Sequence, residues 1–445
     1  MARGKKKESA LTPEEKLAQA LIPEGEQPYR VPENWCWTTL KNVSNIVMGQ
    51  SPAGTDTTDD PSYIPLIGGA ADMGALYPKA TRYTKVPTKI SHAEDIILCI
   101  RATLGRPIYS DGEYCLGRGV AAIRSTILSK EFLRFFFIDQ EQYLYDNATG
   151  TTFAQINSDT LSHMPIALPP LAEQQRIVER IEYLFAKLDE AKEKAQSVLD
   201  SFETRKAAIL HKAFNGELTA KWRAEHGVKL ENWERLKLGE IGNLERGRSQ
   251  HRPRNDPRLF NGPYPFIQTG DVASANVYVT DHRQTLSEFG MAQSRMFPVG
   301  TLCITIAANI GDVAILSYDC CFPDSVVGFT PNQRSISKFI YYMINVLQKE
   351  LEDNAPATAQ KNINLKILNA VEISIPTVEE QTEIVRILDG LFAKEQQAKE
   401  AAEAVLEKID LLKKSILARA FHGELGTNAP SEESAVELLK SLFQA

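Results

Sequence analysis

Cysteine is scarce in this chain, and the few cysteines do not form a metal-binding or disulfide pattern. No Cys-x-x-Cys pair is present, and five of the six cysteines lie in apolar, strand-like segments. They are Cys36, Cys99, Cys115, Cys303, Cys320 and Cys321. We therefore expect buried, reduced thiols rather than disulfides or a zinc site, as in a cytoplasmic protein.

Long hydrophobic runs are also missing. No segment approaches the roughly 20 consecutive apolar residues that a helix needs to cross a bilayer. The first residues, MARGKKKES, are basic, but the apolar core of a signal peptide does not follow them. The sequence therefore predicts a cytoplasmic protein without a membrane partner.

The motifs of common catalytic centres are absent as well. The chain has no Gly-x-x-x-x-Gly-Lys-Ser/Thr loop for a nucleoside triphosphate, no Gly-x-Gly-x-x-Gly turn, no Gly-x-Ser-x-Gly elbow and no metal-ligand spacing among its seven histidines. Asp324 in PDSVV superficially resembles the start of a nuclease motif. Because no acid-x-lysine follows it on a nearby strand, we interpret it as a turn residue. We predict no catalytic residue, metal or cofactor in this chain.

Charge is distributed unevenly. The 445 residues carry a formal net charge of −7, yet the segment RGRSQHRPRNDPR from Arg246 to Arg258 holds five arginines and one aspartate. An acidic total argues weakly against a nucleic-acid binder, but the field at one face matters more than the sum. At this length, and with 43% hydrophobic residues, the chain should divide into two or more globular domains.

The second half of the chain repeats the first. The segment from Pro169 to Leu218 aligns without a gap with the segment 207 residues later, and nearly half of the positions are identical. The preceding segments also correspond, with ENWCWTTLKNVSNIVMGQS from Glu33 facing ENWERLKLGEIGNLERGRS from Glu231. The repeat predicts the order globular unit, long helix, globular unit, long helix, with approximate two-fold symmetry.

Both long helices carry an apolar seam. In the first, the apolar residues step by four and three at Ile177, Ile181, Leu184, Leu188, Ala191, Ala195, Val198 and Phe202. In the second, they are Ile384, Leu388, Leu391, Ala398, Ala402, Val405 and Ile409, with Glu395 as an interruption. A period of 3.5 residues predicts a coiled coil, and Gly216 and Gly423 suit the helix ends. Antiparallel pairing of the two helices satisfies both seams; the alternative is two separate hairpins.

The predicted fold class is α+β, with two mixed α/β domains separated by two long helices that form an antiparallel coiled coil. Short β-branched runs bounded by Gly, Pro or Asp indicate strands in the domains. SKEFLRFFFIDQEQYLYD and SISKFIYYMINVLQKELEDN indicate one helix each. Thr12, Pro13 and Glu15 predict a short capped helix near the N-terminus, and SEESAVELLKSLF predicts another near the C-terminus. The expected boundaries are 1–30 for an N-terminal extension, 31–165 for the first domain, 166–218 for the first helical region, 219–230 for a linker, 231–372 for the second domain, 373–425 for the second helical region and 426–445 for a tail.

Two divergent globular units on a stiff spacer suit DNA recognition, because readers at a fixed separation address two half-sites of a duplex. In the second unit the candidate contacts to phosphates or base edges are Arg246, Arg248, Arg252, Arg254, Arg258 and Gln268. The corresponding loop of the first unit is acidic, so its candidates lie elsewhere, at Lys79, Arg82, Lys85, Lys89, Arg101 and Arg106. The alternative is that solvated loops carry these charges incidentally.

The chain resembles the specificity subunit of Type I restriction–modification enzymes. The resemblance rests on the Asn-Trp pairs at Asn34-Trp35 and Asn232-Trp233, on YPFIQTGDV after the basic loop, on LPPLAEQQRIV with IPTVEEQTEIV, and on the FNGEL and FHGEL helix ends. It covers almost everything from about Val31 to Leu425, while the residues before Val31 depart from the shortest family pattern.

The resemblance implies that residues 31–165 and 231–372 are target-recognition domains, each reading one part of a bipartite, asymmetric DNA site. Residues 166–218 and 373–425 would be conserved helical regions that set the unread spacer and dock methyltransferase subunits. It further implies a chain without activity of its own. Such a chain directs two methyltransferase subunits to methylate adenine N6 with S-adenosylmethionine, and restriction/translocase subunits to cleave unmodified double-stranded DNA with ATP and magnesium.

Two rival hypotheses belong to other classes. A coiled-coil scaffold that binds proteins without DNA specificity would have little need of two different strand-rich units. A nuclease or methyltransferase with unfamiliar motifs conflicts with the missing cofactor loops. We therefore predict a non-catalytic DNA-recognition subunit.

Overall fold

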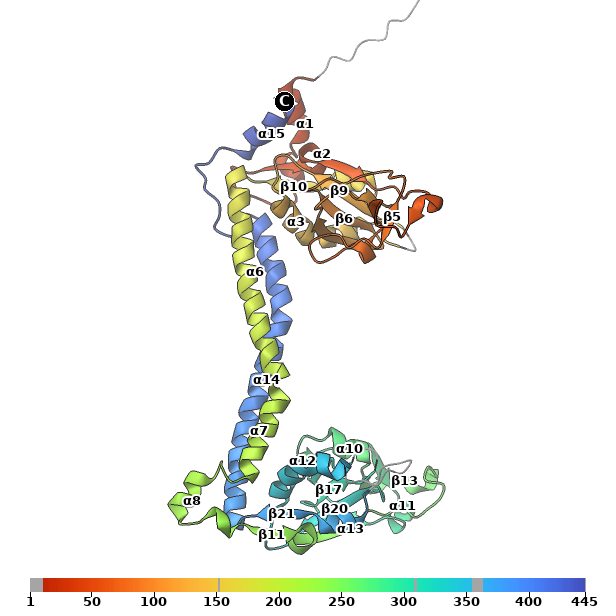
Figure 1. Cartoon of the computed structure of the whole chain (residues 1–445), viewed down its shortest axis with the longest axis vertical. Helices are drawn as coiled ribbons and strands as arrows, with labels where there is room; N and C mark the ends of the chain where they lie inside the picture. The colour runs from red at the N-terminus through yellow and green to blue at the C-terminus, as the bar shows by residue number, and fades with distance from the viewer. Residues whose placement is uncertain (1–10, 151–152, 308–309, 354–362, 445) are drawn as a thin grey trace, which may run out of the picture. The chain divides into compact units, whose positions relative to one another are not determined.

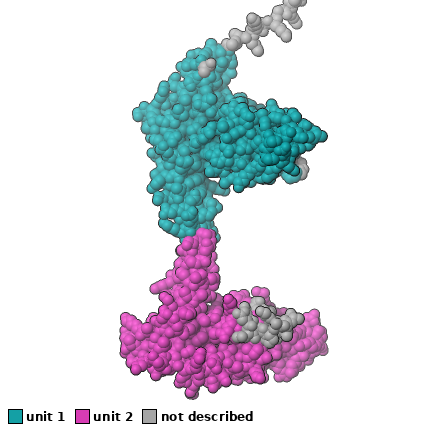
Figure 2. Space-filling model, viewed as in Figure 1, with its two compact units in different colours: residues 1–195, 404–445 teal, residues 196–403 magenta. Residues whose placement is uncertain are grey.

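The computed structural model describes residues 11–150, 153–307, 310–353 and 363–444. The chain forms two compact units, which are residues 1–195 with 404–445 (unit 1) and residues 196–403 (unit 2) (Figure 2). The first ten residues of the predicted N-terminal extension lie outside the described residues. No helix within the described ranges is both long and apolar enough to span a bilayer.

Unit 1 is built around two four-stranded sheets. The larger has the order β2 (Asn45–Met48), β9 (Val120–Arg124), β6 (Ile96–Arg101) and β7 (Thr103–Tyr109), with antiparallel neighbours throughout. The smaller has the order β3 (Thr57–Thr58), β5 (Arg82–Thr84), β4 (Ile64–Ile67) and β8 (Cys115–Leu116). A separate antiparallel ladder joins β1 (Cys36–Thr39) to β10 (Pro165–Leu168), and so brings the two ends of the domain together.

The helices of unit 1 are α1 (Pro13–Ala20), α2 (Leu40–Val43), α3 (Lys130–Asp139), α4 (Glu141–Asp146), α5 (Ser158–Ser162), most of α6 (Leu171–Asp200) and α15 (Ala435–Gln444), together with the end of α14 (Val378–Phe421). Of these, α3 and α4 pack on β7 of the larger sheet, and α1 packs against α15. One apolar core joins β6 and α3 to the first turns of α6 and the last turn of α14, and it contains Ile96, Phe132, Ile177 and Phe421.

Unit 2 repeats this topology with one more strand in its larger sheet and a different edge strand in its smaller one. Its larger sheet has the order β12 (Gly242–Arg246), β20 (Val326–Pro331), β17 (Leu302–Thr305), β18 (Val313–Leu316) and β14 (Tyr278–Val279). Its smaller sheet has the order β15 (Gln284–Leu286), β13 (Phe260–Phe266), β19 (Cys320–Cys321) and β16 (Met296–Phe297), and the end ladder joins β11 (Glu234–Lys237) to β21 (Glu372–Ile375). The helices are α7 (Phe202–Phe214), α8 (Ala220–His226), α9 (Leu238–Ile241), α10 (Thr269–Ser274), α11 (Glu288–Ala292), α12 (Ser337–Asp353), α13 (Leu365–Ala370) and the first part of α14.

The same unusual strand pairing occurs in both small sheets. Most neighbours are antiparallel, but β4 runs parallel to β8, and β13 runs parallel to β19. A shared parallel pair at equivalent places supports common descent of the two halves. The predicted α+β class with an internal repeat is confirmed.

Long helices lie side by side in opposite directions within each unit (Figure 1). In unit 1, Asp189 of α6 bonds Lys413 of α14 at 2.6 Å, while Arg176 near the start of α6 bonds Thr427 beyond the end of α14. In unit 2, Arg205 of α7 bonds Glu395 at 2.8 Å, and Arg223 bonds Glu380. Residue numbers therefore fall along α14 as they rise along its partner, which is consistent with the predicted antiparallel coiled coil.

The first seam is as predicted, since every one of its residues from Ile177 to Phe202 is buried or half-buried. The second is wrong at two positions. Ala398 and Val405 are exposed, and the packed positions are Lys399 and Leu406 instead. Lys399 can occupy an inward position because its stem is apolar and its ammonium lies 5.1 Å from the centre of the Phe202 ring.

Two other helix predictions need correction. The first long helix, expected within residues 166–218, is not continuous, because Ser201 (φ −90°, ψ −3°) separates α6 from α7. There the Arg205 guanidinium donates to the Val198 carbonyl at 3.2 Å. The predicted helix from Ser129 is likewise divided at Gln140 (φ −86°, ψ 13°), so that α3 and α4 both pack on β7.

Several local predictions are confirmed. Thr12 and Glu15 form the reciprocal capping box of α1, and Gly216 (φ 83°) and Gly423 (φ 74°) adopt the left-handed conformation at the helix ends. Asp324 lies in a turn. All six cysteines are buried and unpaired, and burial raises the pKa of the Cys36 thiol to about 12.

Candidate nucleic-acid interface

The arginine loop of unit 2, residues 246–258, is pinned at its start and exposed along its length. It begins at the end of β12, and the Gly247 amide donates to the Val326 carbonyl at 2.9 Å. A Cβ atom at Gly247 would stand 2.3 Å from the Pro323 carbonyl oxygen, so only glycine allows this close crossing. The loop therefore rests against the turn that carries Asp324, while its arginine side chains face solvent.

The five arginines fall into two groups by their partners. Arg254 donates to both carboxylate oxygens of Asp324 at 2.9 and 3.0 Å, and Arg258 bonds Asp256 at 2.7 Å. Hydrogen bonds from Arg258, together with one from His251, hold the pKa of Asp256 well below its ordinary value. These two arginines already have anionic partners within the loop region.

Within the described residues, the hydrogen bonds of the remaining three arginines go to neutral oxygens. Arg246 donates to the Asp324 carbonyl, Arg248 donates to the Gln250 side-chain oxygen at 2.6 Å, and Arg252 donates to the Ser249 and His251 carbonyls at 2.8 Å. A phosphate can replace a neutral acceptor without breaking an ion pair, so these three are the better prepared for DNA.

A small hollow of about 90 Å³ brings three predicted residues together, because Arg248, Arg254 and Gln268 all line it. Gln268 directly precedes α10. Its backbone N–H donates to the Asp271 carboxylate at 2.8 Å, and its side-chain amide donates to the side-chain oxygen of Gln284 at 3.1 Å. Arg246, Arg252 and Arg258 do not line the hollow.

The amide side chains around this hollow were missed by the sequence analysis. Gln250 bonds Arg248, Gln284 bonds Gln268, and Gln293 lines the hollow. Such amides suit the edge of adenine. Gln250 could have been found from its place among the arginines, whereas the other two come from segments that no pattern connects to the loop.

In unit 1, three of the six candidates gather around one turn, residues Ala70–Asp72. The Arg82 guanidinium lies 4.0 Å from the Asp72 carboxylate, Arg106 donates to the Ala70 carbonyl at 3.3 Å, and the Lys79 amide donates to the Asp72 carbonyl at 2.7 Å. The buried Asp72 carboxylate also accepts from the Gly68 amide at 2.6 Å. All three cationic side chains remain exposed around this turn.

The other three candidates lie apart from it. Lys85 stands 5.7 Å from the centre of the Tyr63 ring. Lys89 accepts through its carbonyl from the Leu116 amide at 2.7 Å, and Arg101 ends β6. Their side chains are also exposed.

The turn of unit 1 and the hollow of unit 2 arise at equivalent places. Ile67 ends β4 and is followed by Gly68, while the equivalent Ile267 after β13 is followed by Gln268. The same scaffold therefore presents different chemistry. One unit offers cations around a glycine turn, and the other offers amides and arginines.

A buried glutamate in each half attaches this scaffold to its long helix. The Trp35 indole donates to Glu173 at 2.7 Å, and the equivalent Trp233 indole donates to Glu380 at 3.0 Å. Both carboxylates have no exposed surface. The repeated Asn-Trp and Glu-Gln motifs thus meet in space, although they lie more than a hundred residues apart in sequence.

The next residue of the motif fixes the helix that covers the sheet. The Gln174 side chain accepts from the Ser129 amide at 3.1 Å and donates to the Ile127 carbonyl at 3.0 Å. Its equivalent, Gln381, accepts from the Ile336 amide at 3.2 Å and donates to the Arg334 carbonyl at 2.7 Å. Each glutamate–glutamine pair therefore fixes the position of a sheet domain on the helix that follows it.

The segment that follows each long helix supplies further hydrogen bonds around the buried glutamates Glu173 and Glu380. In unit 2, Arg223 and Thr219 both bond Glu380 at 2.7 Å. In unit 1, Asn428 bonds Glu173 at 2.9 Å, and Arg176 makes a two-point contact with Glu432 of the tail. The linker in unit 2 and the tail in unit 1 therefore both hydrogen-bond the buried glutamate of their unit.

Among the described residues there is no group of three or more histidine, cysteine, aspartate or glutamate side chains arranged to hold a metal ion.

The chain matches the family model described as Type I restriction modification DNA specificity domain at residues 32–199 and again at residues 230–408. The chain belongs to this family.

Individual relatives agree with this membership. The chain is 25% identical over 415 residues to the Type I restriction enzyme EcoBI specificity subunit of Escherichia coli, covering 88% of this chain and 86% of that protein. It is 24% identical over 437 residues to the EcoKI specificity subunit of Escherichia coli strain K12, covering 89% and 90%. The crystal structure of the HsdS subunit from Thermoanaerobacter tengcongensis has the same fold, with a TM-score of 0.67 and 21% identity, over 90% of this chain and 99% of that one.

Proposed function

We propose that this chain is the DNA sequence-specificity subunit of a Type I restriction–modification complex and that it has no catalytic activity of its own. The observation that carries the proposal is one recognition scaffold present twice, with different exposed side chains at equivalent places. A scaffold that only binds proteins has no need of this divergence.

The two units read different halves of a bipartite, asymmetric site. In unit 2, Arg246 and Arg252 hold phosphates, while Arg248, Arg254 and Gln268 around the hollow face base edges. Arg258 adds a cation already balanced by Asp256. In unit 1, Lys79, Arg82 and Arg106 act from the turn at Ala70–Asp72, and Lys85, Lys89 and Arg101 supply phosphate contacts outside it.

The paired helices set the number of unread base pairs and dock the partner subunits. Those partners are two methyltransferase subunits, which use S-adenosylmethionine, and restriction/translocase subunits, which use ATP and magnesium. The recognition domains correspond to residues 31–165 and 231–372, and the helical regions to residues 166–218 and 373–425. Burial of Glu173 and Glu380 at the domain–helix junctions supports rigid attachment of each reader.

Reconstitution tests this proposal. The purified chain should neither methylate DNA with S-adenosylmethionine nor cleave it with magnesium and ATP. The cognate methyltransferase subunit should methylate adenine at one defined bipartite site only when the chain is added. Methylation or cleavage by the chain alone, or a methylation pattern that ignores its presence, would contradict the proposal.

A further inference from the structure

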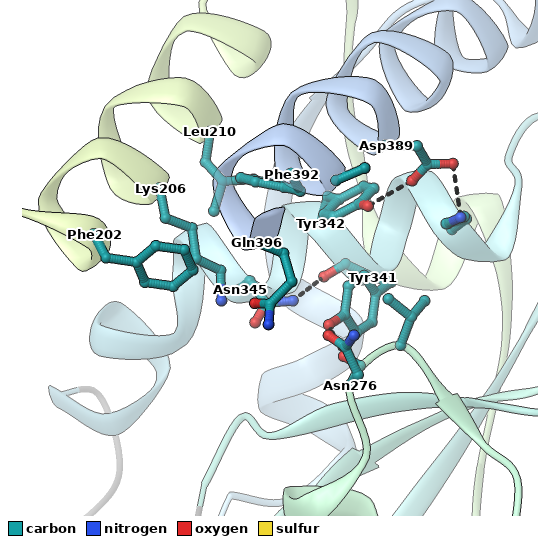
Figure 3. A pocket seen from close by; sticks show the side chains of 13 residues that line it. Phe202, Lys206, Leu210, Asn276, Tyr341, Tyr342, Asn345, Asp389, Phe392 and Gln396 are labelled. Carbon is teal, nitrogen blue, oxygen red and sulfur yellow. Dashed lines mark hydrogen bonds and ion pairs between the residues drawn. The ribbon is translucent and has the colours of Figure 1, made fainter. Parts of the chain in front are cut away.

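Unit 2 contains a cavity of about 400 Å³ between α7, α12 and α14 (Figure 3). The aromatic side chains of Phe202, Tyr341 and Phe392 line the cavity, and so do the polar side chains of Lys206, Asn345 and Gln396. Figure 3 shows the ends of these three polar side chains directed toward one another. The cavity therefore combines a cation, two amides and aromatic rings on the surface of the paired helices.

The acidic residue that lines the cavity, Asp389, already has hydrogen-bond donors within the chain. The Asp389 carboxylate accepts from the Lys338 ammonium at 2.7 Å and from the Tyr342 hydroxyl at 2.6 Å. Burial, and then this carboxylate, raise the pKa of Tyr342. Lys206 is half-buried, and it has no ion-pair partner within the part of the chain that the structure describes. A half-buried cation of this kind favours an anionic partner from outside.

In the first half of the chain, an internal ion pair occupies the position that corresponds to this cavity. By the gap-free alignment of the helices, Lys413 corresponds to Lys206, Asp189 to Gln396 and Phe185 to Phe392. In unit 1 the Lys413 ammonium bonds the Asp189 carboxylate at 2.6 Å and lies 5.0 Å from the centre of the Phe185 ring. Replacement of that aspartate by Gln396 removes the internal anion from unit 2 and keeps the cation.

We propose that this cavity is a docking pocket for an acidic side chain, flanked by an aliphatic or aromatic residue, on the methyltransferase subunit. The proposal rests on the function proposed above, because it takes the paired helices as the docking surface. An external carboxylate takes the place that Asp189 has in unit 1, and its apolar neighbour packs between Phe202 and Phe392.

A protein partner fits better than a small ligand, because an exposed aromatic ring lies beside the cavity. The ammonium of Lys338, which lines the cavity, lies 5.6 Å from the centre of the Tyr278 ring, and Tyr278 is 44% exposed. An apolar anchor surrounded by a polar rim is the arrangement found where binding energy concentrates in protein interfaces.

Two substitutions in the full-length chain test the pocket. Gln396→Asp recreates the internal ion pair of unit 1 and fills the anion position, and Lys206→Gln removes the cation. Lys413→Gln, which changes the equivalent lysine of unit 1, is the matched control. Native mass spectrometry and equilibrium binding with the cognate methyltransferase subunit give the stoichiometry and each Kd, and unfolding midpoints confirm folding.

We expect both unit 2 substitutions to weaken one of two methyltransferase binding events about tenfold or more, while Lys413→Gln leaves both unchanged. Unchanged binding by folded Gln396→Asp and Lys206→Gln overturns the pocket and leaves the proposed function standing. A small carboxylate ligand that co-purifies with the wild-type chain and is lost from both variants, with docking intact, also overturns it. A wild-type chain that binds no methyltransferase subunit contradicts the proposed function itself.

Discussion

Two buried glutamates stand out at the scale of single residues, because each holds a tryptophan from the far end of its domain. Glu380 also has an arginine partner, Arg223, which is only 9% exposed. Glu173 has Asn428 and Thr427 in the equivalent place. The buried carboxylate is therefore balanced by an ion pair in unit 2 and hydrogen-bonded by neutral donors in unit 1.

This difference predicts unequal effects of neutralising the two carboxylates. Glu380→Gln leaves the buried Arg223 without a counter-charge, and we expect the unfolding free energy to fall by about 3 to 5 kcal/mol. Glu173→Gln strands no arginine, so its cost should lie nearer about 1 to 3 kcal/mol. Denaturant unfolding of each variant measures this. Glu383→Gln, whose carboxylate pairs with the exposed Arg386, should cost below about 1 kcal/mol and is the control. Equal losses for the two buried sites would show that the ion pair is not decisive.

The arginine loop gives a second prediction at this scale. Arg252→Ala combined with Arg254→Ala should weaken binding to the half-site read by unit 2 by about 1 to 3 kcal/mol and leave the other half-site unaffected. Arg258→Ala should have a smaller effect, because Arg258 is paired with Asp256 and, unlike Arg254, does not line the hollow. Binding of the reconstituted complex to duplexes altered in one half-site at a time gives the answer. A uniform loss at both half-sites would contradict the assignment of the loop.

The sequence predicted which cations are exposed but not how they are partnered. All of the candidate arginines and lysines face solvent, as charge and polarity dictate. Whether Arg254 meets Asp324, or Arg82 meets Asp72, depends on turns that bring distant segments together, and residue spacing carries no information on such turns. The buried Glu173 and Gln174 resembled ordinary polar residues of a first helical turn until the structure placed Trp35 and Ser129 beside them.

At the scale of elements, apolar periodicity predicted the first seam fully and the second only in part. The true packed positions around the middle of α14 are Glu395, Lys399, Ala402, Leu406 and Ile409, which keep steps of four and three. Two of them, Glu395 and Lys399, are charged. The apolar pattern therefore selected Ala398 beside Lys399 and, seven residues later, Val405 beside the packed Leu406. Arg205 and the Phe202 ring compensate those charges, and both lie on another helix.

The pairing of Asp189 with Lys413 marks matching points for changing the helix length in unit 1. Seven residues inserted after Asp189 and seven inserted before Lys413 keep the seam and add about 10.5 Å of helix rise. We expect the unread spacer to lengthen by about three base pairs, at about 3.4 Å each, while both half-sites stay the same. Sequencing of methylated adenines reads both quantities at once. An insertion in one helix only breaks the pairing and should abolish methylation, whereas an unchanged spacer in the double insertion would rule out the helices as its determinant.

At the scale of the whole molecule, the chain has a net charge of −7, yet all of the lysines and arginines proposed to contact DNA are exposed. Partner subunits that enclose the duplex can supply most of the phosphate contacts. We therefore expect the isolated chain to bind DNA weakly and with a steep dependence on salt, and the complex to bind its site tightly. Titrations at several salt concentrations, with and without the methyltransferase subunit, measure both. Tight, site-specific binding by the chain alone would contradict this division of labour.

The central claim is that each unit reads its own half of the site, and exchange of one unit tests it most directly. Residues 31–165 are replaced by the corresponding domain of another family member, and methylated adenines are mapped across the host genome. The account predicts a new sequence in one half of the site, with the other half and the spacer unchanged. An unchanged site, or a change in both halves, would contradict it.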